Sequence, residues 1–407
     1  MLPRCPESRG GVPRLAPALS LAEVLRAGLP GFARTHRLPA HHWKVLNALQ
    51  VCHTPLLGGH QYQCGHCHRM HFAPHACGNR HCPSCQGINS RQWLAAQAEV
   101  VLPIPYFHLV FTLPHELNPL IRQNQKPLYR LLFASVSETL LSFGRNNLDA
   151  LLGITAVLHT WSQNLLDHYH LHCIVTGGGL SLDRTRWVSS HPRYLFNVTA
   201  LSQVFRAKFC EGLQKLYTEG QLGFHGKLAP LKQQANFQAV VRQATRHDWV
   251  VYSKRPFAGP EQVLAYLSRY THRVGISNSR LKHLDQAAGQ VSFDYKDYAQ
   301  GGQHKTMVLA LEEFIRRVCL HILPPHFVKI RHYGLLANHG RQERLEQARA
   351  LLPAKSGKTA AGHLPLKTPT PAPALPICPY CGQPALVLIG VVGPQRWWAE
   401  PKPEDSS

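Results

Sequence analysis

One short stretch decides how this chain is interpreted: Asp167-His168-Tyr169-His170-Leu171-His172-Cys173-Ile174-Val175. Side chains alternate between the two faces of a β-strand, so His170 and His172 share one face and Leu171 points to the other. Two imidazoles held on a rigid strand can bind a divalent cation that keeps open positions for a phosphate oxygen. The stretch therefore predicts a core strand that carries a metal site suited to phosphodiester chemistry.

A third ligand would complete this metal site. Gln163 is our first prediction, because it lies seven residues upstream of His170 and its amide oxygen suits Mg²⁺ or Mn²⁺. His168 and His159 are the alternatives. A single histidine in a chain with 27 of them is most often an ordinary polar residue. Histidines at alternate positions beside an apolar strand favour a metal site instead.

The segments on either side of this strand predict a sheet with helices. Residues 106–113 are β-rich and stop at Pro114, and 154–160 has the composition of a second strand. Apolar spacing predicts further helices and strands, namely helices over about 117–151, 198–219, 260–269 and 311–319, a strand over 249–252, and a hairpin over 291–309. This mixture of strands and helices is typical of an α+β domain.

The composition limits the class of partner. The chain has 407 residues and 44% apolar content, which is enough for a substantial core. Its 44 Lys and Arg against 22 Asp and Glu give a net charge of +22, which favours a polyanion such as nucleic acid. No stretch reaches the roughly 20 apolar residues that span a bilayer, and residues 3–9 do not resemble a signal peptide. We therefore expect no membrane partner and a cytoplasmic location.

Half of the twelve cysteines lie within residues 52–85, which indicates a metal site rather than a disulfide framework. Two pairs, Cys64 with Cys67 and Cys82 with Cys85, have the spacing of a zinc ribbon in which four thiolates hold one structural Zn²⁺. Further donors could form a second zinc site or exchange with the first set: Cys52, His60, Cys77 and His81. We interpret this module as structural and as contacting DNA.

A third cysteine pair, Cys378 and Cys381, lies near the other end of the chain. It has the form of one zinc knuckle, which is half of a tetrahedral site. The sequence leaves two interpretations open: a turn with two spare thiols, or metal binding completed by a histidine or by another chain.

Tyr266 and Tyr270 are four residues apart and would share one face of a helix. Such a pair is more often part of a core than a pair of nucleophiles. The cations around it shift that balance, because they suit the phosphates of DNA: Lys254, Arg255, Arg269 and Arg273. A phenol has a pKa of about 10, so a nucleophilic tyrosine would need a metal, a base or a nearby cation to activate it.

Taken together, these motifs resemble the two-tyrosine HUH transposases of rolling-circle insertion sequences. The resemblance rests on the histidine pair, the two tyrosines, the cysteine module with Arg80-His81-Cys82-Pro83, and Arg331-His332-Tyr333-Gly334. It covers roughly residues 20–345. It implies an α+β fold, in which a small zinc-binding domain precedes an HUH nuclease domain built on an antiparallel sheet flanked by helices.

The resemblance also implies a reaction and its participants. Tyr266 and Tyr270 would be the nucleophiles that attack single-stranded DNA at transposon ends and at the target. Each attack would leave a 5′-phosphotyrosine and a free 3′-OH, with His170 and His172 holding the catalytic Mg²⁺ or Mn²⁺. Because this exchange conserves the phosphodiester bond energy, no nucleotide cofactor is needed, and the chain has no complete P-loop motif. Host replication factors in a bacterial cell are the further partners implied.

We expect four regions: a loose leader over 1–20, a zinc-binding and DNA-contacting domain over 21–100, the nuclease domain over 101–345, and a flexible basic Pro-rich tail over 346–407. Two other functions remain open. One is a plasmid replication initiator or relaxase, which would share the metal and tyrosine chemistry. The other is a zinc-dependent DNA-binding protein without catalysis, in which the histidines and tyrosines are structural.

Overall fold

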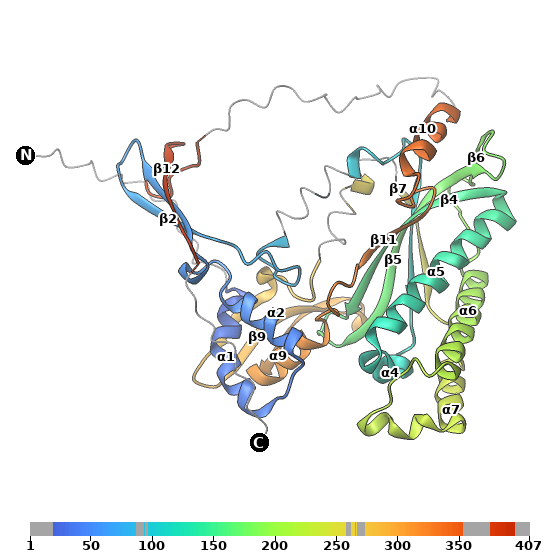
Figure 1. The fold of residues 1–407 in the computed structure, drawn as a ribbon, viewed down its shortest axis with the longest axis horizontal. Helices are drawn as coiled ribbons and strands as arrows, with labels where there is room; N and C mark the ends of the chain where they lie inside the picture. The colour runs from blue at the N-terminus through green and yellow to red at the C-terminus, as the bar shows by residue number, and fades with distance from the viewer. Residues whose placement is uncertain are drawn as a thin grey trace, which may run out of the picture.

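The computed structural model describes residues 19–86, 93, 97–257, 262–264, 266, 273–352 and 375–394. Its strands form three sheets in which every pair of neighbours is antiparallel, and helices pack against them (Figure 1). The predicted fold class, α+β with an antiparallel sheet flanked by helices, is confirmed. None of the described helices is long and apolar enough to cross a membrane.

The largest sheet has the strand order β11-β4-β5-β3-β7, with β6 paired to β5 at its far end. The bounds of its strands are β3 Tyr106–Thr112, β4 Ala150–Trp161, β5 Asp167–Ser181, β6 Trp187–Ser189, β7 Val251–Phe257 and β11 Ile330–Gly334. The long hairpin β4–β5 forms its centre. The strands expected over 106–113, 154–160 and 170–175 are therefore confirmed, and the structure places them side by side.

The two faces of this central sheet differ because apolar and polar residues alternate along its strands. Leu171 and Phe111 point to the face covered by α5 (Gln125–Leu148) and α6 (Val198–Thr218), where they join a core that includes Phe205. Figure 1 shows both helices packed along that side of the sheet. The opposite face carries histidines, and these are described with the site below.

The N-terminal helices do not form a core of their own. Helices α1 (Leu21–Thr35) and α2 (Ala40–Gln50) share one apolar cluster with the second sheet and α9, in which Phe32 packs in the same group as Phe293 and Phe314. The second sheet has the order β10-β9-β8, with β8 Leu281–Asp285, β9 Gln290–Asp297, β10 Gln303–Ala310 and α9 Leu311–Leu320. The expected boundary at residue 100 therefore does not separate two cores, because residues 276–322 complete the N-terminal one.

The third sheet joins the two ends of the described chain. Its order is β12-β1-β2, with β1 Gly59–Cys64, β2 Met70–Pro74 and β12 Leu386–Val392. In Figure 1, β12 lies beside β2 and β1, far from α10 (Arg341–Leu351), which is the preceding described element. The expectation of a flexible tail over 346–407 is thus wrong for 375–394, because the edge of β1 pairs with this segment along six residues of β1. Residues 353–374 lie outside the described part of the chain.

The remaining elements connect these layers. Helices α4 (Asn118–Gln123) and α7 (Gln234–Ala244) pack at the end of the central sheet below α5 and α6 (Figure 1). Short 3-10 helices occupy loops: η1 Pro55–Leu57, η2 His115–Leu117, η3 Gly226–Lys232, η4 Asn278–Arg280 and η5 Tyr298–Gln300. The expected helix over 260–269 is described at 262–264 and 266, where the chain is helical.

Candidate metal and tyrosine site

Four histidines from three neighbouring strands lie on one face of the central sheet. His170 and His172 alternate along β5, His159 of β4 is paired directly with His170, and His108 of β3 is paired with Ile174. Directly opposed residues of antiparallel strands point to the same face, so the sheet register alone brings the four rings together. This is the face opposite Leu171, as the alternation predicted.

Three of these rings form a group that could hold a cation. One ring nitrogen from each of His159, His170 and His172 lies within 4.8 Å of the other two. The Nε2 atoms of His170 and His172 are 3.1 Å apart. His170 Nδ1 lies 2.8 Å from the carbonyl oxygen of His168, so this nitrogen donates its proton there and leaves Nε2 as the free ligand atom.

Burial keeps His170 and His172 neutral at neutral pH. Loss of hydration lowers the pKa of His170 to about 3, and the neighbouring His168 adds to this effect. The same burial, reinforced by His159 and His170, holds the pKa of His172 well below its usual value. A neutral imidazole keeps a lone pair for a metal. The two neutral imidazoles of His170 and His172, together with the nearby ring of His159, therefore fit a divalent cation.

His159 takes the place that we expected for Gln163. Gln163 lies in the turn between β4 and β5, beyond the pair formed by Trp161 and Asp167, where its carbonyl oxygen accepts a hydrogen bond from the guanidinium of Arg280. At about 3.3 Å per residue, that turn is roughly 10 Å along the strands from the His159–His170 pair. We therefore infer that the third ligand is His159, which had been an alternative, rather than Gln163.

Tyr266 meets this group at its edge. Its Oη lies 2.5 Å from His108 Nε2 and 3.4 Å from His172 Nδ1, and those two ring nitrogens are 3.0 Å apart. The half-buried tyrosine packs in the same apolar cluster as Val263, which is fully buried on the same short helical segment. Tyr270, the second expected nucleophile, lies outside the described residues.

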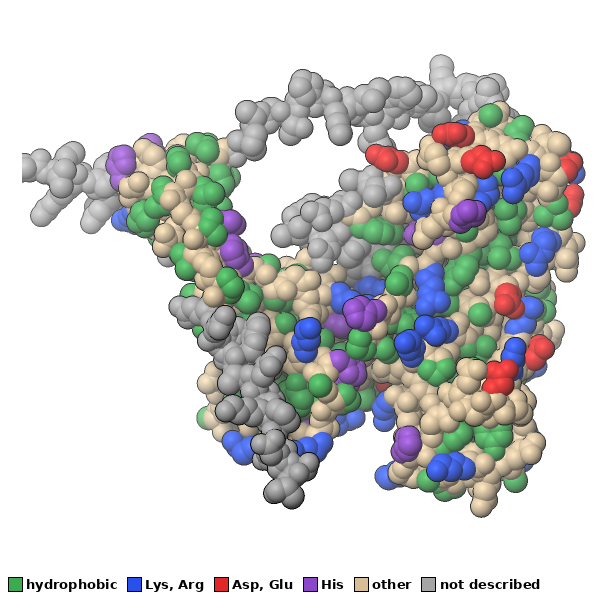
Figure 2. All heavy atoms as spheres, in the orientation of Figure 1, with side chains coloured by type: hydrophobic (Ala, Val, Ile, Leu, Met, Phe, Trp, Pro, Cys, Tyr) green, Lys and Arg blue, Asp and Glu red, His purple; other side chains and the backbone are tan. Residues whose placement is uncertain are grey.

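Two of the four expected DNA-binding cations flank the histidines. The charge of Lys254, on β7 and paired with His108, adds to the burial that lowers the pKa of His108 to about 4. Arg273 is among the charges that act on His172 from another side. The middle of the face in Figure 2 carries Lys, Arg and His side chains, whereas Asp and Glu side chains lie over the half with the central sheet. The side chain of Arg255 and the whole of Arg269 lie outside the described part.

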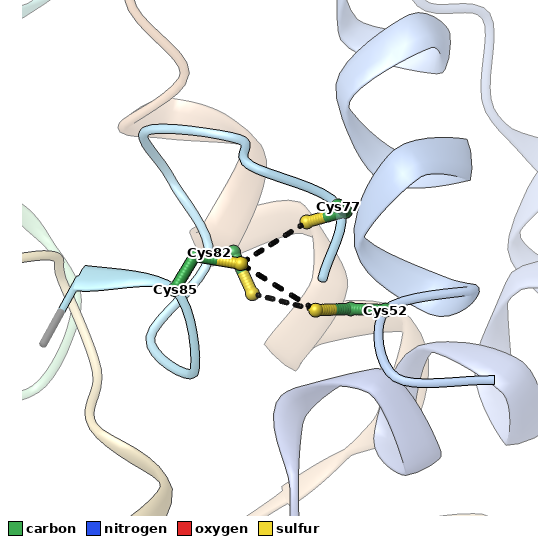
Figure 3. A group of neighbouring side chains, drawn as sticks. All are labelled: Cys52, Cys77, Cys82 and Cys85. Carbon is green, nitrogen blue, oxygen red and sulfur yellow. Dashed lines mark hydrogen bonds between the residues drawn. The ribbon is translucent and has the colours of Figure 1, made fainter. Parts of the chain in front are cut away.

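The cysteines form two groups of four, and neither is the group expected. Cys82 and Cys85 lie with Cys52 and Cys77 (Figure 3), whereas Cys64 lies in the other group. That second group contains Cys64, Cys67, Cys378 and Cys381. The predicted ribbon of Cys64, Cys67, Cys82 and Cys85 is therefore wrong, because each of its two pairs is completed by a different pair of cysteines.

The Cys52 group has the dimensions of a zinc site. Its sulfur atoms are 3.4 Å apart for Cys82 and Cys52, and 3.6 Å apart for Cys85 with both Cys52 and Cys77. Tetrahedral zinc with Zn–S bonds of about 2.3 Å separates its sulfurs by about 3.8 Å, whereas a disulfide needs about 2.05 Å. The group closes the N-terminal core between α2 and the knuckle that contains Cys82.

Neither histidine of the alternative zinc set joins a cysteine group. His81 is held by Asn79 and by the backbone amide of Leu323, and burial lowers its pKa to about 3. His60 lies on β1, where its ring meets the edge of His75. Hydrogen bonds thus hold His81, and His60 packs against a neighbouring ring.

Sequence reasoning missed His108 as a site residue. A lone histidine in an apolar strand is common, and only the pairing of β3 with β5 brings it to His172 and Tyr266. One signal was present: residues 106–113 alternate so that His108 lies on the face opposite Phe107 and Leu109, both in the apolar core. A histidine on the second face of a core strand indicates that this face is not packed as apolar core and could carry a functional site.

Comparisons with known proteins match this chain to transposases. A family model described as a transposase zinc-binding domain matches residues 24–113, and one described as "Putative transposase" matches residues 153–344. The chain is 41% identical over 374 residues to "Putative transposase y4qJ" of Sinorhizobium fredii, covering 87% of this chain and 92% of that protein. It is 30% identical over 302 residues to the "Transposase for insertion sequence element IS801" of Pseudomonas savastanoi pv. phaseolicola, covering 72% and 70%. No solved structure matches it.

Proposed function

Since this chain belongs to the insertion-sequence transposases that carry an N-terminal zinc-binding domain, we propose that it cuts and rejoins single-stranded DNA by metal-assisted tyrosine transesterification. The observation that carries this proposal is the contact of 2.5 Å between Tyr266 Oη and His108 Nε2, at the edge of the three-histidine group. A phenol beside a neutral base and a cation site has what it needs to become a nucleophile.

His159, His170 and His172 would hold the divalent cation. When bound, this cation polarises the scissile phosphate and leaves the protein to position the reacting atoms. His170 ligates through Nε2, because its Nδ1 donates to the backbone of His168. If His172 also ligates through Nε2, its Nδ1 carries the proton and points at His108 Nε2, 3.0 Å away.

In the proposed first step, Tyr266 Oη attacks phosphorus and the bond from phosphorus to the 3′ oxygen breaks. The phenolic proton passes to His108 Nε2, the leaving 3′ oxygen takes up a proton from solvent, and the DNA keeps its phosphate on Tyr266 as a 5′-phosphotyrosine. Lys254 and Arg273 would bind the neighbouring phosphates, with Arg255 and Arg269 as further candidates. Reversal of the same step with a new 3′-OH rejoins strands without a nucleotide cofactor.

Tyr270 would serve the second strand transfer. The role follows from the resemblance and from the spacing of four residues between the two tyrosines, which would place them on one face of a helix. Two nucleophiles on one helix face would let one tyrosine remain linked to the first strand while the other attacks the second. This transfer at transposon ends and at the target is what moves an insertion sequence.

A covalent adduct tests the proposal. The full chain is incubated with labelled single-stranded oligonucleotides that carry insertion-sequence ends, with Mg²⁺ or Mn²⁺, and is analysed on a denaturing gel. We expect a protein–DNA band with the wild type and none with Tyr266→Phe/Tyr270→Phe. An adduct in the double variant would overturn the nucleophile assignment. Absence of any adduct with the wild type, alongside tight DNA binding, would favour a non-catalytic DNA-binding protein.

A further inference from the structure

Cys378 and Cys381 lie outside the residues matched by either family model, and the fold carries them to the zinc-binding domain. We propose that they form a second structural zinc site with Cys64 and Cys67, and that this zinc fastens the C-terminal segment to the N-terminal domain. The ligand is a single Zn²⁺ ion held by four thiolates, two from each end of the chain.

The sulfur geometry fits zinc. Cys64 Sγ lies 3.7 Å from Cys381 Sγ, and Cys67 Sγ lies 3.7 Å from Cys378 Sγ. These distances match the separation of about 3.8 Å between sulfurs on tetrahedral zinc. All four sulfurs lie within 4.8 Å of one another. Each pair therefore contributes to one tetrahedron, and no sulfur is close enough to another for a disulfide.

Both cysteine pairs have the backbone form of a zinc knuckle. In the first, the amide of Cys67 donates to Cys64 Sγ at 3.4 Å, and the residue after the pair, His68, has a positive φ of 58°. In the second, the residue after the pair is Gly382, with a φ of 74°, and its amide donates to the carbonyl oxygen of Cys378. The same turn at two distant places, facing each other, is the arrangement of a two-knuckle site.

The strands next to the knuckles hold the two pairs in register. Cys64 ends β1 and is paired with Leu386, the first residue of β12, and the amide of Gly65 donates to Ala385 at 2.7 Å. The Arg69 guanidinium lies 5.5 Å from the centre of the Tyr380 ring, which adds a cation–π contact across the two segments. Among the described residues, the buried core of this sheet consists of Cys64, Cys378 and Leu386, with four partly buried residues packed against them.

So small a core cannot hold a three-stranded sheet by itself. Most of the apolar residues of β12 beyond Leu386 are exposed, with Leu388 and Val391 half or more accessible to solvent. Structural zinc supplies folding free energy where an apolar core is missing. The pairing of β12 with β1 should therefore depend on the metal, and the zinc makes the C-terminal segment part of the zinc-binding domain.

Zinc content gives the first test. We expect native mass spectrometry of the purified full chain to show one zinc ion fewer in Cys378→Ser/Cys381→Ser than in the wild type. Cys210→Ser, a half-buried cysteine of α6 outside both groups, should keep the wild-type number. A single zinc in the wild type, or equal numbers in the wild type and the double variant, would overturn the proposal.

A second measurement uses the unaltered chain, so that misfolding of a variant cannot decide the outcome. Iodoacetamide labelling followed by mass spectrometry compares zinc-loaded protein with protein treated with a chelator. We expect Cys67 and Cys381 to react at least tenfold more slowly with zinc bound, and amide exchange in β12 to rise at least tenfold after chelation. Equal labelling rates, or unchanged exchange in β12, would refute a metal-held C-terminal segment.

Discussion

Replacing His108 tests whether a base next to Tyr266 drives strand cleavage. In the wild type, His108 Nε2 is 2.5 Å from Tyr266 Oη, while the next ring nitrogen, His172 Nδ1, is 3.4 Å away. His172 Nδ1 also carries a proton if this residue ligates a cation through Nε2. Alanine at 108 therefore removes the base 2.5 Å from the phenol, and glutamine restores a hydrogen-bond partner there that does not take up the proton.

The size of the effect follows from general base catalysis. A positioned base contributes roughly 100- to 10,000-fold in rate, which corresponds to about 3 to 5 kcal/mol in the activation free energy. We expect both His108→Ala and His108→Gln to lose cleavage rate within this range. His115→Ala is the matched control, because this histidine follows the same strand and its side chain is 87% exposed.

The assay is single-turnover cleavage of a labelled single-stranded oligonucleotide, first at a Mn²⁺ concentration that saturates the wild type and then at higher concentrations. Thermal unfolding is recorded for each variant. Mn²⁺ binding is titrated in parallel, because His108 also contacts His172. A variant that cleaves within threefold of the wild type would refute the role of a base. So would a loss that disappears when Mn²⁺ is raised, since His108 would then act only by orienting a metal ligand.

Three further predictions concern the metal ligands, the helix packing and the buried histidines. His159→Ala should weaken Mn²⁺ binding at least tenfold, measured by calorimetry, while Gln163→Ala should leave it unchanged. If Gln163→Ala weakened binding and His159→Ala did not, Gln163 would be the third ligand. Gly28→Ala should lower the free energy of unfolding in urea by about 1 to 3 kcal/mol, because an added Cβ would lie 2.6 Å from an α9 side chain. In the control Gly31→Ala the nearest neighbours are 3.9 Å away, so this change should be neutral or slightly stabilising. Equal effects of the two substitutions would contradict this packing. Burial lowers the pKa of His321 to about 4 in the folded chain, whereas in the unfolded chain a histidine has a pKa of about 6.5. As the pH drops from about 6.5 towards 4, the unfolded chain takes up this proton and the folded chain does not, so the free energy of unfolding falls. This one residue should contribute about 3 kcal/mol to that fall, and urea titrations of His321→Gln should show a correspondingly smaller pH dependence; an unchanged slope would exclude it as the source.

The sequence predicted the part of the site that is local in the chain. His170 and His172 share a face because they alternate along one strand, and this needs no knowledge of the rest of the fold. The third ligand depends on the register of the β4–β5 hairpin, which pairs His159 with His170. That register is set by the length of the turn, which the strand pattern left undefined. The sequence favoured an amide oxygen, which suits Mg²⁺. The sheet register brings in a third imidazole instead, and imidazole suits transition metals better than Mg²⁺.

The cysteine grouping could not be obtained from spacing. A knuckle is defined within four residues, but its partner is chosen by the fold. Cys64 and Cys82 lie close in sequence, yet β1 carries the first away from the N-terminal core while the second closes it. The pair at Cys378 was visible as half a site, and its partner emerged only from the pairing of β12 with β1.

The pairing of β1 with β12 imposes an order on biosynthesis. Cys64 and Cys381 are 317 residues apart, so at roughly 5 to 20 residues per second β1 waits roughly 15 to 60 seconds on the ribosome for its partner strand. During that interval β1 has an unpaired edge, and the thiols of Cys64 and Cys67 lack the second cysteine pair. Chains that are being synthesised on the same messenger RNA can then pair their strands with that edge of β1, in competition with the chain's own β12. The yield of closed monomers should therefore depend on how quickly the 3′ end of the message is translated.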